Sequence, residues 1–145
     1  MDLTALPQDY RRKPKGVVGG QFSMHFTAAV SAQTGNLTWD DYARYLEDPT
    51  TLSLAERIEV SEDPQMNAIY PERMGGKVMI QFRDGTSQSR CVEIPRGEPA
   101  NFPAADLHQS KFLSLAEPVL GDGALKLHER LIALAHAESI DTLFG

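Results

Sequence analysis

Apolar side chains in the first part of the chain recur at the spacing of an amphipathic helix. One stripe of residues 21–33 consists of Phe22, Phe26, Ala29 and Val30. These positions are separated by four, three and one residues, which places them on a single helical face. Gly35 follows and predicts a left-handed cap at the end of this helix. Further helices are expected from Thr38, whose spacing to Asp41 is that of a capping box, and after Asp48-Pro49.

The period then changes to the alternation typical of a half-buried strand, at residues 58–60. The clearest local signal is Asp84-Gly85 between two extended runs, residues 77–83 and 86–94. An Asp-Gly pair supplies the positive φ angles of a tight turn, so these runs predict a β-hairpin. Two helices, at about residues 104–117 and 122–137, close the chain. This order predicts an α+β fold: a two-layer sandwich of about three mainly antiparallel strands covered by helices.

The positions of proline and glycine residues predict how the chain is divided. Residues 1–20 contain two prolines, three glycines and few apolar anchors, which is typical of a flexible N-terminal arm. A length of 145 residues suits one domain. We therefore expect an arm over residues 1–20 and a folded domain over residues 21–145.

Composition excludes several classes of function. A net charge of −6 argues against nucleic-acid binding, which needs a basic surface. No apolar run is long enough to span a membrane. A single cysteine, Cys91, excludes an internal disulfide, and the start of the chain lacks the features of a signal peptide, so a cytoplasmic location is expected. No histidine pair has the spacing of a helical metal site, and no phosphate-binding or dinucleotide-binding glycine motif is present, so no metal or cofactor is expected.

Two side chains remain as candidates for chemistry. His25 lies beside the aromatic stripe of the first helix, where it serves either as an acid or base or as a structural residue. Arg96 lies in a loop between two prolines. It either clamps a carboxylate with two hydrogen bonds or closes the loop on a surface glutamate. From residues alone, the sequence indicates a soluble α+β domain of unstated function.

Several motifs, taken in order along residues 21–143, resemble the C-terminal domain of the MmgE/PrpD family of 2-methylcitrate dehydratase-like lyases and epimerases. They are Phe22-Ser23-Met24-His25-Phe26 with Ala29, Gly35-Asn36-Leu37, residues 54–60, Asp63-Pro64, Tyr70-Pro71, Asp84-Gly85, the loop Pro95-Arg96-Gly97-Glu98-Pro99 with Asn101, and Lys111-Phe112 with Leu115-Ala116. The first of these is similar to the family's FSxxY helix, and the loop at Arg96 is similar to its proline- and glycine-rich loop.

The resemblance implies a small domain that normally accompanies a large helical domain, with the pocket between them. Family members abstract a proton next to a carboxylate without a metal, and then eliminate or epimerise. His25 is then the expected catalytic residue, and Ser23, Phe26 and Arg96 are the expected substrate-binding residues. Phe26 occupies the position of the family's pocket tyrosine and has no hydroxyl group; neighbouring His25 is the candidate replacement.

Two functions follow from the resemblance. One is the small subunit of a split, metal-independent dehydratase, decarboxylase or epimerase that acts on a small carboxylate and is completed by a helical subunit. The other is a non-catalytic binding or assembly module that kept the fold, and the missing tyrosine favours this second function. Either predicts a helical partner or self-association. A fragment without a function of its own is the third alternative.

Overall fold

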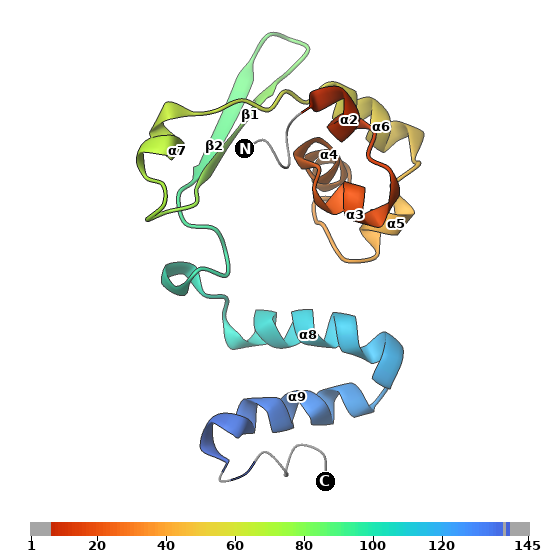
Figure 1. The fold of residues 1–145 in the computed structure, drawn as a ribbon, viewed down its shortest axis with the longest axis vertical. Coiled ribbons are helices and arrows are strands. Elements are labelled where there is room, and N and C mark those ends of the chain that lie inside the picture. Colours follow the sequence, from red (N-terminus) through yellow and green to blue (C-terminus); the bar gives the residue numbers. More distant parts are fainter. Residues whose placement is uncertain (1–6, 138, 140–145) are drawn as a thin grey trace. The chain divides into compact units, whose positions relative to one another are not determined.

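The computed structural model describes residues 7–137 and residue 139. The chain divides into two compact units, the first ending at Tyr70 and the second beginning at Pro71 (Figure 1).

The first unit is helical. Its described elements are α2 (Gln8–Arg12), α3 (Gly16–Gln21), α4 (Met24–Thr34), α5 (Asp41–Arg44), α6 (Pro49–Glu56) and α7 (Pro64–Ala68). Helix α4 packs against α2, α3 and α6. It ends at Gly35, whose φ of 77° confirms the left-handed cap expected from the sequence. The amide of Thr38 donates to Asp41 Oδ2 at 2.7 Å, as the capping spacing predicts. The Thr38 hydroxyl donates to the same oxygen at 2.7 Å, and the N-cap of α5 is Asp40 rather than Thr38.

The apolar core of this unit lies between α4 and α6. Phe26, Ala29, Val30 and Ala55 are fully buried there. Gly20 brings the end of α3 close to this core, because a Cβ atom at that position would lie 3.2 Å from the ring of Phe26. Trp39 lies outside this core and is 60% exposed.

The segment expected to be a flexible arm contains α2 and α3 in its described part. Ion pairs attach it to the rest of the unit: Arg12 to Glu59 at 2.6 Å and Lys13 to Glu56 at 2.7 Å. Both acidic partners lie more than forty residues further along the chain. Helices as short as α2 are marginal alone, so these tertiary contacts account for their presence.

The second unit holds the sheet. Its elements are β1 (Gly76–Gln81), β2 (Ser87–Val92), the 3-10 turn η1 (Pro99–Asn101), α8 (Ala105–Leu120), α9 (Gly123–Ala133) and η2 (Leu134–His136). The two strands pair antiparallel, from Gly76 opposite Val92 to Gln81 opposite Ser87. Gly85 has a φ of 86° in the connecting turn, which confirms the predicted hairpin. Every position of both strands is exposed within the described residues.

Helices α8 and α9 form an antiparallel pair (Figure 1). Ala124 and His128 are the buried residues of α9, and the His128 ring lies 5.2 Å from that of Phe112. His128 is buried although Glu129 and Arg130 follow it directly in sequence. Leu115 and Val119 follow Phe112 at helical spacing but are 51% and 82% exposed. Pro118 lies within the last turn of α8, and the helix continues to Leu120.

The predicted α+β class is confirmed. The number of strands differs: the described residues form two strands, where about three were expected. Residues 58–60 alternate in polarity but form no strand. The carbonyl of Ile58 accepts a hydrogen bond from Arg12 Nη2 at 3.2 Å. The Arg12 side chain thus takes the place of the backbone amide that would pair with this carbonyl in a β-sheet.

Candidate functional site

The candidate site is built around His25, in the first turn of α4. The side chain is fully buried. Its Nε2 lies 3.4 Å from Oε1 of Gln8 on α2. Its Nδ1 is buried without a hydrogen-bond partner among the described residues. Buried polar atoms are nearly always paired, so this atom requires an explanation.

Arg12 links Gln8, the neighbour of His25, to Ile58 and Glu59, which come much later in the chain. Its Nη2 donates to Gln8 Oε1 at 3.1 Å, to the Ile58 carbonyl at 3.2 Å and to Glu59 Oε1 at 2.6 Å. Its Nη1 also lies 3.8 Å from Asp9. The guanidinium therefore carries its charge into a partly buried region beside a carboxylate partner.

These surroundings favour the neutral imidazole. Burial lowers the pKa of His25 below its usual 6.5, because removal from water disfavours the charged ring. The charge of Arg12 lowers it further, and the carboxylate of Glu59 opposes the shift. His25 is thus held in the form that can accept a proton at neutral pH.

Ser23 and Phe26 lie next to His25 and are both buried. Ser23 is the N-cap of α4: its Oγ accepts a hydrogen bond from the Phe26 amide at 3.0 Å and donates to the Arg11 carbonyl. The ring of Phe26 lies 6.3 Å from that of Tyr42 and has no exposed surface. In this structure both residues hold α2, α3 and α4 together.

Arg96 belongs to the second unit. Its side chain is exposed, in a loop that Asn101 closes through its amide nitrogen to the Ile94 carbonyl at 2.9 Å. Gly97 follows with a φ of 109°, which only glycine adopts readily. The structure therefore brings Ser23, His25 and Phe26 together in one unit and places Arg96 in the other.

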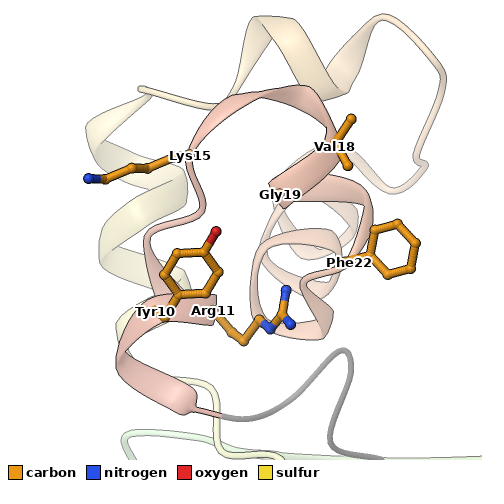
Figure 2. Close-up of a pocket in the computed structure, with 6 residues that line it drawn as sticks. All are labelled: Tyr10, Arg11, Lys15, Val18, Gly19 and Phe22. Carbon is orange, nitrogen blue, oxygen red and sulfur yellow. The ribbon is translucent and has the colours of Figure 1, made fainter.

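A shallow depression of about 380 Å³ lies on the surface formed by α2 and α3 (Figure 2). Its lining residues are Tyr10, Arg11, Lys15, Val18, Gly19 and Phe22. In Figure 2, Lys15 extends on one side of this surface, and Val18 and Phe22 project on the other. The Arg11 guanidinium stands 5.3 Å from the centre of the Tyr10 ring, a cation–π distance.

The depression was not predicted, because residues 1–20 were expected to form a flexible arm. The signal that could have found it is local: Tyr10 stands beside Arg11-Arg12-Lys13, and Val17 and Val18 follow Pro14. Aromatic and β-branched residues are uncommon in disordered segments.

A second depression, of about 450 Å³, lies in the second unit. Its lining residues are Pro71, Glu72, Arg73, Met74, Ile94, Pro95, Glu98, Pro99 and Ala100. An ion pair joins Arg73 to Glu93 beside it. Arg96 is not among the lining residues, although both of its flanking segments contribute to them.

Within residues 7–137 and 139, no group of three or more histidine, cysteine, aspartate or glutamate side chains is arranged to hold a metal ion. Within the same residues, no helix has the length and apolar character needed to cross a membrane.

Comparison with known families identifies the family of this chain. The sequence model of the MmgE/PrpD C-terminal domain matches residues 4–140. The chain belongs to the MmgE/PrpD family. The match confirms the resemblance read from the motifs, and it begins within the segment expected to be an arm. Comparisons with curated proteins and with solved structures gave no significant match.

Within this MmgE/PrpD domain, the FSxxY-like motif is the loop and first turn of α4. The segment that resembles the family's proline- and glycine-rich loop leads into η1 and carries Arg96. The two motifs with candidate chemistry thus lie in different units of the domain.

Proposed function

We propose that this chain is the small subunit of a split, metal-independent MmgE/PrpD-type enzyme that acts on a small carboxylate as a dehydratase, decarboxylase or epimerase. A separate helical subunit would complete the pocket. The observation that carries this proposal is an exposed apolar face at the start of the family domain. This docking face consists of Tyr10, Val18 and Phe22, which line the depression on α2 and α3 and are each 47–67% exposed.

The docking face is next to the candidate site along the chain. Phe22 directly precedes Ser23, and Ser23 caps the helix that carries His25. A cluster of large apolar side chains beside a depression is typical of a surface that a partner covers. In the family, the corresponding covering part is the large helical domain.

His25 and Arg96 would supply the chemistry in such a complex. A neutral imidazole takes a proton from carbon, and the imidazolium formed in that step then donates a proton to the leaving group. An arginine binds a carboxylate through two parallel hydrogen bonds. Ser23 and Phe26 would line the same pocket. Because His25 has no exposed surface, a substrate reaches it only if part of the first unit moves when the partner binds.

The second candidate, a non-catalytic assembly module, is favoured by a different observation. Ser23 uses its hydroxyl to cap α4 and to bind the Arg11 carbonyl, and Phe26 is an interior core residue. Both therefore have a structural role without any substrate. Such a module would keep the docking face and have no turnover.

Co-purification of the tagged full-length chain from its native source tests the proposal. We expect a helical partner that resembles the family's large domain, and lyase or epimerase turnover only in the complex. Val18→Asp should weaken the complex, because it places a charge in the docking face. Ser53→Asp, an exposed position on α6, adds the same charge elsewhere and serves as the control.

Turnover in the complex distinguishes the candidates. His25→Ala and Arg96→Ala should each lower it while the complex still forms and circular dichroism shows the chain folded. Unchanged turnover in both variants would remove these residues from the mechanism. A complex without any turnover favours the assembly module, and a chain that remains a monomer with its native partners present contradicts both candidates.

A further inference from the structure

The hydrogen bonds around His25 determine which of its nitrogens carries the proton. Arg12 fixes the orientation of the neighbouring Gln8 amide, because a guanidinium has only donors. Arg12 Nη2 lies 3.1 Å from the side-chain amide of Gln8. The atom of that amide that faces Arg12 must therefore be its carbonyl oxygen, Oε1, and not its nitrogen.

The same oxygen faces the histidine. Oε1 of Gln8 lies 3.4 Å from His25 Nε2. A carbonyl oxygen only accepts hydrogen bonds, so a contact of this kind requires the proton on Nε2. In the neutral ring, Nδ1 then carries a lone pair and no proton.

We infer that Arg12 and Gln8 are positioning residues that hold His25 as its Nε2–H tautomer and leave Nδ1 as the proton-accepting atom. A second observation supports this assignment. Nδ1 is buried and has no hydrogen-bond donor among the described residues. An unpaired buried acceptor costs stability, which is expected where an atom is kept available for a ligand or a proton.

The functional meaning of this tautomer rests on the proposed function. If His25 acts on a carboxylate substrate, Nδ1 is the atom that takes the proton, and Nε2 is the atom that anchors the ring to α2. The tautomer itself does not depend on any activity. It can therefore be measured on the isolated full-length chain.

The experiment is nitrogen-15 NMR of the His25 ring in the wild-type chain above its titration midpoint. We expect the shifts of a single tautomer, with a pyrrole-type Nε2 and a pyridine-type Nδ1. Gln8→Met removes the acceptor and should lose the single-tautomer signature. Arg12→Lys keeps a charged group with donors only and should retain it. Gln33→Met is the matched control, because Gln33 accepts a hydrogen bond from Thr51 on α6 and does not bond to His25.

Titration of the same resonances separates positioning from general loosening of the fold. Arg12 and Glu59 are the charged groups that act on His25. Arg12→Met should raise the titration midpoint, and Glu59→Gln should lower it. Loosening of the unit would raise the midpoint in both variants, because it would return the ring to water.

The outcomes distinguish this inference from the proposed function. A protonated Nδ1 in the wild-type chain, or an equal mixture of tautomers, overturns the inference. A single Nε2–H tautomer that survives Gln8→Met also overturns it. If the tautomer is found as expected but His25→Ala leaves turnover of the complex unchanged, the inference stands and the catalytic role fails.

Discussion

The two units of the chain differ in how they bury their side chains. In the first, Phe26, Ala29, Val30 and Ala55 form an apolar core, and buried polar groups such as Ser23 and Thr51 surround it. In the second, Ala124 and His128 are the buried residues among those described, while the hairpin exposes Val78 and Ile80. A two-stranded hairpin is marginal in water without a packed face. The first unit is therefore stabilised within itself, and the second has more to gain from a partner.

The largest expected effect comes from the centre of the first unit. Phe26→Ala should lower the free energy of unfolding by about 3–5 kcal/mol, because it removes a fully buried ring and leaves a cavity between α3 and α4. Chemical denaturation followed by circular dichroism measures this loss. Phe22→Ala is the matched control, since the Phe22 ring is 47% exposed and its truncation should cost little. Equal losses in the two variants would contradict the core assigned to this unit.

Adjacent glycines in α3 give a sharper test of the same packing. A Cβ atom at Gly20 would lie 3.2 Å from the Phe26 ring, so Gly20→Ala should destabilise the unit by about 1–3 kcal/mol through overpacking. At Gly19 the nearest atom would be Pro14 Cβ at an ordinary 3.4 Å. Gly19→Ala should then be neutral or stabilising by up to about 1 kcal/mol, since alanine is the better helix former. Thermal unfolding of both variants checks the difference in sign.

Acid should weaken the first unit through His25. Its pKa is lowered in the folded state, so the unfolded chain binds a proton at a higher pH than the folded chain does. Stability is therefore fully present above about pH 6.5 and falls as the pH decreases toward the lowered pKa. A second loss is expected in more acidic solution, because hydrogen bonds from Thr38 lower the pKa of Asp41.

Melting temperatures at about pH 7.5 and about pH 5.5 measure the first of these losses. His25→Gln removes the titrating group and should flatten this part of the profile. A wild-type profile that is already flat over this range would show that His25 titrates as an exposed histidine does.

Local signals predicted the parts of the fold that depend on neighbouring residues. The hairpin follows from Asp84-Gly85 and the end of α4 from Gly35, because turn and cap geometry are set within a few positions. Helix α2 was missed because Arg12 and Glu59, far apart in sequence, hold it in place. The burial of His128 was missed for a similar reason: its neighbour Phe112 lies on another helix.

The sequence likewise predicted those parts of the candidate site that depend on residues close together along the chain. His25, Ser23 and Phe26 are close in sequence, and the structure finds them together. The partners of His25 could not be inferred, because Gln8 and Arg12 lie in a segment whose composition indicated an arm. Arg96 was selected from its loop between two prolines and from the family motif, and the structure places it in the second unit, whereas the other three residues belong to the first.

The smallest expected effect is that of a valine-to-threonine substitution in the second unit. The same isosteric substitution in the first unit provides the comparison. Val78→Thr on β1 keeps the shape and the strand preference of the side chain, and Val78 is 62% exposed, so stability should change by less than about 0.5 kcal/mol. Val30→Thr in α4 buries a hydroxyl in the apolar core and should cost about 1–3 kcal/mol. Denaturation of the isolated chain compares the two. A loss at Val78 as large as that at Val30 would mean that the hairpin face is covered in solution, by a second copy if the loss depends on protein concentration.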